Sequence, residues 1–354
     1  MSIFSETDTV RLVEDDPSRP YVEAIDQTLL PAELKLVRLS DTASITDAIK
    51  RLVVRGAPAI GVCAALGLYV VARRGFEDGI TGDDPESLLS YVRKEGGFIS
   101  ESRPTAVNLS WAINRMLGLA ESEFKKGSDA PAILRALHDE SETIFNEDID
   151  VCRRIGEVGA DLIKDGYGIL THCNAGRLAT VRYGTATAPV YLAASQGKKL
   201  RVYCDETRPL LQGARLTAYE LSAAGIDTTL LCDNMSASLI KSGAIDAIFV
   251  GCDRVASNGD AANKVGTSAL AIIAKRYGIP FYVCAPTSTI DPATPTGDDI
   301  VIEQRDPDEV TDLWYEKRMA PDSIGVYNPA FDVTPYSDIT AILTENGISK
   351  PPFN

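Results

Sequence analysis

An acid, an amide and a lysine follow a short apolar run in the stretch Ile248–Thr267, and these side chains can transfer protons and bind an anion. The run Ala247–Val250 is typical of a buried strand, and Asp253 comes shortly after it. Asn263 and Lys264 are predicted to lie where the next helix begins. In open α/β sheets, ligands bind beyond the carboxyl ends of the strands, so this stretch is a candidate site. An ordinary polar loop between a strand and a helix would contain the same residue types.

The second candidate is a cysteine between a predicted strand and a glycine turn. Cys173 opens the sequence Cys-Asn-Ala-Gly, which is predicted to lead into a helix. The positive N-terminal end of a helix can lower the pKa of a thiol, so Cys173 is the best candidate for a reactive thiol. The other cysteines at strand ends fit the role of small buried hydrophobes, because three of them precede an aspartate that disfavours a thiolate.

Further polar residues follow another predicted strand and mark two helix starts. Either Asp205 or Glu206 can face a cleft at the end of that strand, and Gln212 is suited to bind a hydroxyl group. The turn Arg55-Gly56-Ala57-Pro58 and the turn at Arg103 each combine an arginine with a proline that begins a helix. Helix N-termini bind phosphate, so the two turns could converge on one anion. Each string taken alone is also typical of a structural turn.

These residues depend on a scaffold in which short apolar runs alternate with helical stretches after Tyr167. The predicted strands are Gly168–His172, Leu200–Tyr203, Thr228–Leu231, Ala247–Val250 and Phe281–Val283. The predicted helices are Leu178–Ser195, Leu216–Ala224, Ser236–Lys241 and Thr267–Tyr277. This alternation predicts a Rossmann-like, doubly wound parallel sheet with right-handed crossovers. The glycine pattern of dinucleotide-binding sites is missing after the first strand, so nucleotide binding is poorly supported.

The first part of the chain is predicted to be mostly helical, with a small antiparallel sheet. The predicted strands are Tyr21–Ile25 and Lys35–Leu39, followed by a helix capped by Asp41 or Ser44 that extends to about Val53. An apolar helix from Ala59, a loop at Gly75–Ser87, a helix over Asn108–Phe124 and charged helices over Ala132–Lys164 come next. We therefore expect an N-terminal helical domain (1–130), connecting helices (131–165) and a catalytic domain (166–354).

Composition excludes several classes of protein. The 354 residues carry a net charge of −15, which argues against nucleic acid or an anionic membrane as partner. Seven cysteines without a C-x-x-C pair indicate reduced thiols in the cytoplasm. With two histidines, histidine-based metal sites and Ser-His-Asp triads are nearly excluded, and no metal is expected. Met1–Asp8 has no secretory pattern, and the apolar segment Ala57–Ala72 is short for a membrane span.

Several ordered strings together resemble one enzyme family. They are Thr171-His-Cys-Asn-Ala-Gly, the run Asp205–Ala218, Gly251-Cys-Asp-Arg-Val-Ala-Ser-Asn-Gly-Asp, Asn263-Lys-Val-Gly-Thr, Pro286-Thr-Ser-Thr-Ile-Asp and Arg55-Gly-Ala-Pro-Ala-Ile-Gly. The chain resembles the methylthioribose-1-phosphate isomerase family from about Ile25 to Pro335. That family is related to ribose-1,5-bisphosphate isomerases and to regulatory subunits of the translation-initiation guanine-nucleotide exchange factor.

The resemblance implies a fold, a reaction and a set of site residues. It implies a cytoplasmic homodimer with a helical N-terminal domain and a Rossmann-like domain. Its enzymes convert 5-methylthio-D-ribose 1-phosphate, an aldose, to 5-methylthio-D-ribulose 1-phosphate in methionine salvage, without a metal or other cofactor. By motif, Cys173 and Asp253 match the catalytic pair. The substrate-binding matches are Arg55, Gly56, Ala57, Arg103, Gln212, Asn263 and Lys264.

The implied reaction makes these residue types reasonable. A phosphate on the anomeric oxygen prevents spontaneous ring opening, so a general acid must assist cleavage of the ring C–O bond. We expect Asp253 to be that acid, held partly protonated by a closed apolar site. Either the Cys173 thiolate then removes the proton from C2, or a hydride moves directly from C2 to C1 while Cys173 stabilises the transition state.

The sequence departs from the family pattern at Arg177, Thr187-Ala188-Pro189, Ser268 and Trp314–Lys317. These positions bear on the pocket for the 5-substituent of the sugar, so 5-deoxyribose 1-phosphate and ribose 1,5-bisphosphate are alternative substrates. A regulatory or ligand-sensing protein is the non-enzyme alternative, and such a protein would be expected to lack the thiol–acid pair.

Overall fold

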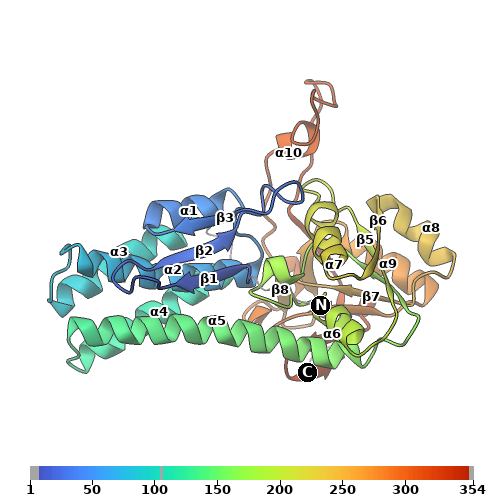
Figure 1. Ribbon diagram of the computed structural model, residues 1–354. Coiled ribbons are helices and arrows are strands. Elements are labelled where there is room, and N and C mark those ends of the chain that lie inside the picture. Colours follow the sequence, from blue (N-terminus) through green and yellow to red (C-terminus); the bar gives the residue numbers. More distant parts are fainter. Residues whose placement is uncertain (1–7, 104–106, 351–354) are drawn as a thin grey trace. The chain divides into compact units, whose positions relative to one another are not determined.

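The computed structural model describes residues 8–103 and 107–350, and its ribbon is shown in Figure 1. The chain divides into two compact units. The helical unit comprises residues 8–151 together with Arg177–Gly184. The sheet unit comprises Cys152–Gly176 and residues 185–350. A short piece of chain directly after the Cys-Asn-Ala-Gly turn therefore folds with the N-terminal part of the protein.

A small antiparallel sheet opens the helical unit. Its strands are β1 (Val10–Val13), β2 (Tyr21–Ile25) and β3 (Leu36–Leu39), with β2 in the centre. The helices that follow are α1 (Thr42–Lys50), α2 (Ala57–Glu77), α3 (Pro85–Ser100), α4 (Val107–Lys125) and α5 (Ala130–Ala160), of which α5 belongs to the helical unit up to Val151. The mostly helical N-terminal region and its small sheet agree with the prediction.

Local signals fix the ends of these helices. Asp41 caps α1, because its carboxylate accepts a hydrogen bond from the Ser44 N–H while the Ser44 hydroxyl accepts one from the Asp41 N–H. The helix ends at Lys50, short of Val53, because Leu52 adopts a left-handed conformation with φ of 62°.

The loop predicted at Gly75–Ser87 is partly wrong. Helix α2 continues to Glu77, and α3 already begins at Pro85. The Asp84 carboxylate caps α3 by accepting a hydrogen bond from the Ser87 N–H at 2.9 Å. An N-cap followed by proline is a strong helix start that the glycines and charges of the segment concealed.

Helix α2 is apolar on all sides and forms the centre of the helical unit. It is longer than the apolar segment read from the sequence, and its length and composition would suffice to cross a membrane. However, 83% of its most apolar 18-residue stretch is buried inside the protein, where the helix packs against α3 and α4 among others. A helix that is hydrophobic all round is expected in such a core position.

The sheet unit is built on a seven-stranded mixed sheet in the order β14-β13-β10-β7-β4-β5-β6. The strands are β4 (Gly168–Thr171), β5 (Arg201–Asp205), β6 (Asp227–Leu231), β7 (Ala247–Val250), β10 (Phe281–Cys284), β13 (Ala341–Thr344) and β14 (Gly347–Ser349). All neighbours are parallel except the antiparallel pair of β13 and β14. All five runs predicted as strands lie in this sheet, whereas β13 and β14 were not predicted.

Helices α6 (Ala188–Ser195), α7 (Ala218–Ala223), α8 (Ser236–Lys241) and α9 (Thr267–Tyr277) connect these strands. The predicted helix Leu178–Ser195 is wrong in its first half, where a short 3-10 turn, Arg177–Ala179, is followed by irregular chain up to α6. Residues 177–184 belong to the helical unit instead. The Thr9 N–H donates to the Val181 carbonyl at 3.0 Å, and the Val181 N–H donates to the Asp148 carboxylate at 2.7 Å.

A second sheet of four short strands was not predicted. Its order is β11-β8-β9-β12, with β8 (Arg254–Ala256), β9 (Ala261–Lys264), β11 (Ile290–Asp291) and β12 (Phe331–Thr334). Asn263 and Lys264 therefore lie in strand β9 and not at the start of a helix, which corrects the prediction. Their strand is fixed by pairing with β8 and with the distant β12, and α9 begins only at Thr267.

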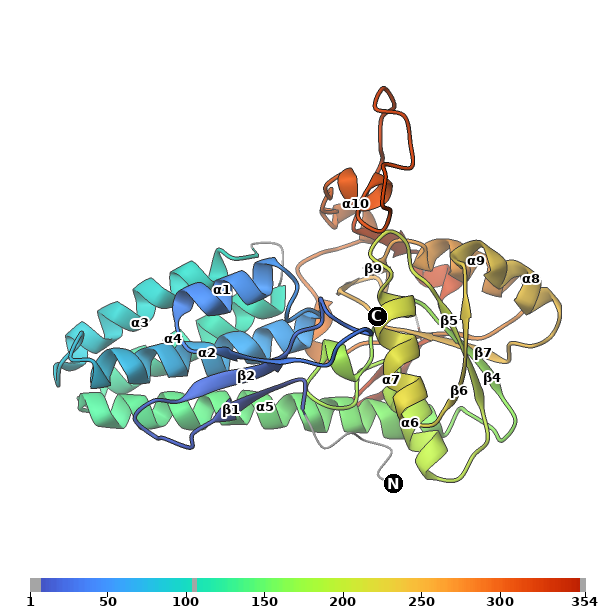
Figure 2. The same cartoon turned by 45° about the horizontal axis from the view of Figure 1, so that its top comes forward.

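An arm projects from the sheet unit between Gln304 and Pro329, which form a β-bridge at its base. It contains helix α10 (Asp308–Thr311) and extends away from the seven-stranded sheet in both views (Figure 2). The Trp314 indole N–H donates to the Pro209 carbonyl at 2.7 Å, and the Arg215 guanidinium lies 4.8 Å from the indole ring centre. The unusual segment Trp314–Lys317 is therefore anchored at its tryptophan to the chain that flanks Gln212.

Candidate active site

Cys173 lies in a strained turn directly after β4. Its backbone is left-handed, with φ of 65°, and the residue is 9% exposed. Non-glycine residues adopt this conformation at a free-energy cost, so they require support from the surrounding structure. Here the Cys173 N–H donates to the Thr207 hydroxyl at 2.8 Å, and the Cys173 carbonyl accepts from the Thr217 hydroxyl at 2.6 Å. Two threonines therefore fix the backbone that carries the thiol.

Thr207 is itself left-handed, with φ of 66°, and it follows β5. A β-branched residue in this conformation is a true outlier. The Thr207 N–H donates to the Asp233 carboxylate at 2.7 Å, and the Thr207 hydroxyl donates to the Asp205 carbonyl at 3.1 Å. Two strained turns on neighbouring strands are thus hydrogen-bonded to each other, which is typical of functional sites.

The turn that carries Asp253 packs beside the Cys173 turn. Strands β4 and β7 are parallel neighbours, and chain order reverses between them, since β5 and β6 extend the sheet on one side and β10 and β13 on the other. A Cβ at Gly251 would lie 2.4 Å from the Ala175 Cβ, so only glycine permits this close approach. The Asp253 N–H donates to the Ala262 carbonyl at 2.9 Å, which ties the turn to β9.

Asn263 and Lys264 end strand β9 in the same unit. The Asn263 amide donates to the Thr267 hydroxyl at 3.0 Å. The Lys264 ammonium donates to the Ala330 carbonyl at 2.9 Å and lies 4.6 Å from the centre of the Phe331 ring. Strand β12 therefore positions the lysine, and its charge is held against an aromatic face.

Gln212 supplies an unsatisfied acceptor in the described part of the chain. Its side chain is 7% exposed, and its buried amide oxygen accepts no hydrogen bond from any described residue. A buried acceptor without a partner is costly, so such atoms in native proteins call for an explanation. A hydroxyl group of a bound ligand would satisfy it.

The predicted phosphate-binding residues belong to the helical unit. Gly56 has φ of 88° and precedes α2, and a Cβ there would lie 2.5 Å from the Ala179 Cα. Arg55 and Ala57 flank it, each partly buried. Arg103 follows α3 and is also partly buried, whereas the predicted continuation at 104–106 lies outside the described residues.

The expected helix directly after Cys173 is wrong, because α6 begins only at Ala188. Cys173 therefore does not lie at the N-terminus of the helix that was expected to lower its pKa. The other cysteines at strand ends are predicted to be small buried hydrophobes, which agrees with the burial of Cys204 and Cys284 but is wrong for Cys232, which is exposed. Burial raises the pKa of Cys204 and of Cys284, and the charge of Glu206 raises that of Cys232.

Sequence reasoning missed a buried cluster beside this turn. His172, Asp205 and Asp233 bring possible metal-ligand atoms within 4.8 Å of one another. These atoms already have internal partners, since His172 binds Asp205, and both Asp233 oxygens accept backbone N–H groups of residues 207 and 208. The cluster is therefore a hydrogen-bond network. Its sequence signal was a histidine adjacent to the candidate cysteine and an acid at the next strand end.

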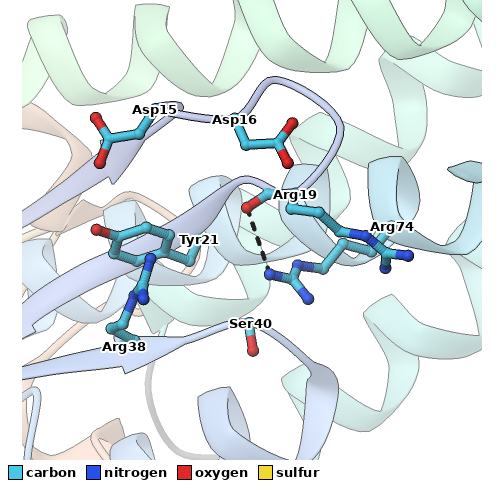
Figure 3. Close-up of a pocket in the computed structure, with 7 residues that line it drawn as sticks. All are labelled: Asp15, Asp16, Arg19, Tyr21, Arg38, Ser40 and Arg74. Atoms are coloured by element: carbon cyan, nitrogen blue, oxygen red, sulfur yellow. Dashed lines mark hydrogen bonds between the residues drawn. The ribbon is translucent and has the colours of Figure 1, made fainter.

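A surface pocket of about 360 Å³ lies in the helical unit (Figure 3). Its lining includes three arginines and two aspartates, and none of the predicted substrate-binding residues. The arginines serve internal contacts: Arg19 pairs with Asp78 at 2.6 Å, Arg38 stacks over Tyr21, and Arg74 donates to the Pro20 carbonyl at 2.8 Å. We interpret this pocket as a consequence of how the β1–β2 turn is held against α2.

Known proteins resemble the chain over nearly its whole length. The sequence model of the initiation factor 2 subunit family matches residues 53–351. A methylthioribose-1-phosphate isomerase of Symbiobacterium thermophilum is 56% identical over 331 residues, which cover 93% of this chain and 90% of the relative. A 5-deoxyribose 1-phosphate isomerase of Clostridium botulinum is 50% identical over 338 residues, covering 96% and 95%. The crystal structure of 5-methylthioribose 1-phosphate isomerase from Pyrococcus horikoshii superposes with a TM-score of 0.91 at 42% identity, covering 99% and 95%.

Proposed function

The chain belongs to the initiation factor 2 subunit family, and from this premise we propose that it isomerises 5-methylthioribose 1-phosphate to 5-methylthioribulose 1-phosphate. The observation that carries the proposal is the 56% identity, over 93% of the chain, to an enzyme named for this activity. The relatives at 50–56% identity are named as isomerases of methylthioribose 1-phosphate or 5-deoxyribose 1-phosphate, which supports isomerisation of a sugar 1-phosphate as the reaction.

We propose that the sheet unit is Rossmann-like and that catalysis takes place where its strand order reverses. Numbered along the chain, the parallel strands follow the order 3-2-1-4-5-6 from β6 to β13. In such sheets the ligand crevice lies between strands 1 and 4, which here are β4 and β7. The turns of Cys173 and Asp253 follow these two strands.

In this proposal Asp253 is the general acid that opens the sugar ring, and Cys173 acts on the hydrogen that moves from C2 to C1. In one route the Cys173 thiolate removes the C2 proton to form an enolate-like intermediate. In the other route a hydride moves directly from C2 to C1. Turnover in deuterated water distinguishes them, because solvent deuterium at C1 of the product supports proton transfer, whereas its absence supports hydride shift or a shielded proton.

The remaining predicted residues bind the substrate in this proposal. Arg55, Gly56, Ala57 and Arg103 serve the phosphate, and Gln212, Asn263 and Lys264 serve the sugar and the phosphate. Arginine and lysine supply local positive charge in a protein whose net charge is −15. The unsatisfied Gln212 oxygen supports its assignment to a sugar hydroxyl. Arg103→Ala is expected mainly to raise KM.

Two substitutions test the catalytic assignment. Cys173→Ser and Asp253→Asn should abolish turnover while the circular dichroism spectrum stays that of the wild type. Near-normal turnover by Asp253→Asn would mean that the assigned acid is wrong. A folded wild-type chain without any isomerase activity would favour the alternative of a regulatory or ligand-sensing protein.

A comparison of kcat/KM for three sugar phosphates determines which substituent at C5 of the sugar the enzyme prefers. We expect 5-methylthioribose 1-phosphate to be a good substrate and 5-deoxyribose 1-phosphate to be its closest rival, since a relative at 50% identity is named for the latter. Ribose 1,5-bisphosphate is expected to be poor, because a second phosphate requires further cations. A preference for the bisphosphate would refute this order.

We further propose that the protein is a cytoplasmic homodimer of methionine salvage that binds neither nucleic acid nor membrane. Light scattering during gel filtration tests the dimer, and a monomeric mass would contradict it. The negative net charge supports the absence of polyanionic partners.

A further inference from the structure

His172, the neighbour of Cys173, faces a hydrogen-bond acceptor with each of its ring nitrogens. Its side chain is 1% exposed. Its Nδ1 lies 3.0 Å from the Asp205 Oδ2, and its Nε2 lies 2.9 Å from the Val265 carbonyl oxygen. A backbone carbonyl can only accept, so Nε2 carries a proton. The other Asp205 oxygen accepts from the Ser236 hydroxyl, so an ionised Asp205 has a donor at both oxygens when Nδ1 carries a proton.

The His172 ring also packs against the turn that follows β9. Gly266 lies directly on the imidazole, since a Cβ there would be 2.8 Å from the His172 Cε1. This turn joins Asn263 and Lys264 to helix α9. The His172 ring therefore contacts Asp205 at the end of β5 and the Val265 carbonyl in the β9–α9 turn. Because His172 directly precedes Cys173, the ring links these two segments to the Cys173 turn.

Three acidic side chains of the described residues act on the ring. Asp205 at the end of β5 bonds to it, Asp233 after β6 raises its pKa through its charge, and Asp332 of β12 also interacts with its charge. Burial lowers the pKa of His172, but the hydrogen bond and charge of Asp205 outweigh this and raise it above its ordinary value. The environment thus favours the charged ring over the neutral one.

We propose that His172 is a buried imidazolium that acts as a positioning residue, holding the Cys173 turn, the β5 turn and the β9–α9 turn in one arrangement. Its role in turnover rests on the proposed function, whereas its protonation does not. With Asp205 ionised, a neutral ring has one N–H for two acceptors, so it would leave either the Val265 carbonyl or Asp205 without its donor, and an unsatisfied buried acceptor is destabilising.

Histidine NMR tests the protonation directly, because the chain contains only two histidines. With ¹⁵N-labelled histidine, His138→Gln assigns the remaining ring to His172. We expect protons on both of its ring nitrogens at about pH 7 to 8, where an exposed imidazole is neutral. Asp205→Asn should remove one of these protons, whereas Ser236→Ala, which keeps the carboxylate, should retain both. An unprotonated ring nitrogen in the wild type would overturn the imidazolium.

Hydrogen exchange and kinetics test the positioning role. For folded His172→Gln we expect faster amide exchange in peptides covering residues 171–176 and 263–268, and a kcat lower by about 10- to 100-fold. Wild-type exchange and wild-type kcat in this variant would overturn the positioning role. A wild-type protein without isomerase activity would defeat the proposed function instead, and the exchange and NMR measurements would still decide the inference.

Discussion

The stability of the helical unit should fall as pH rises, because of one carboxyl group in α5. Asp148 accepts the Val181 N–H at 2.7 Å, and burial raises its pKa from 3.8 to about 7. Below pH 3.8 the group is protonated in both the folded and the unfolded state. Between the two values the unfolded state releases the proton while the folded state keeps it, so stability is lost as pH rises towards 7.

The difference between the two pKa values corresponds to at most about 4 kcal/mol. Asp148 retains partial contact with solvent, which screens its charge, so we expect about 2 kcal/mol. Asp148→Asn keeps the shape and an acceptor for Val181 but cannot ionise. The variant should therefore match the wild type near pH 4 and exceed its free energy of unfolding by about 2 kcal/mol at about pH 8.

Urea unfolding measures this difference in the helical unit. The chain has two tryptophans, so Trp314→Phe leaves Trp111 of α4 as the single reporter. Both proteins carry this background, and Asp150→Asn, an exposed neighbour on α5, serves as the matched control. The reasoning is refuted if the gap between Asp148→Asn and the parent is constant with pH, or if Asp148→Asn is the less stable protein at about pH 8.

Three further substitutions and one control test the packing of the site, each by chemical denaturation and by turnover. Gly266→Ala should destabilise the sheet unit by about 2 kcal/mol or more, through its φ of 103° and the clash with the His172 ring. The control is Gly278→Ala at the other end of α9, where Gly278 has φ of 70° and an added Cβ would meet no atom within 4 Å, so we expect a loss of stability of only about 1 kcal/mol. Equal losses of stability in the two variants would refute the clash with the His172 ring. Asp332→Ala should cost about 1–2 kcal/mol, because its carboxylate accepts N–H groups at the start of α9, and an unchanged stability would show that this cap is dispensable. Gly251→Ala should lower kcat and stability, since its Cβ would lie 2.4 Å from the Ala175 Cβ, and a fully active variant would show that the two turns need not touch.

Local patterns were sufficient for several elements of the sheet unit. Strand β7, helix α8 and helix α9 have the predicted bounds. Alternating apolar runs and helices predicted the parallel strands because each strand is buried by adjacent elements of the same chain region.

The errors occur where distant chain decides the structure. Asn263 and Lys264 read as a helix start, yet β12 pairs with them across more than 60 residues and makes them a strand. Because Cys173 and Asp253 each follow a predicted strand, the sequence could predict that their turns lie at the same edge of the sheet. It could not predict the left-handed backbone of Cys173. That conformation depends on the hydroxyls of Thr207 and Thr217, which no local pattern connects to it.

The segment 177–184 makes the helical unit discontinuous in sequence. Gln27 donates its amide to the Leu178 carbonyl at 2.7 Å, and the fully buried Val181 side chain belongs to the hydrophobic core around α2. During synthesis this unit cannot be completed until residue 184 has left the ribosome, after β4 has already been made. A gene fragment that ends at Val151 would lack part of its own core. The helical unit therefore cannot be transferred to another protein as one continuous piece of chain. A transfer would also have to include residues 177–184, which directly follow the cysteine turn.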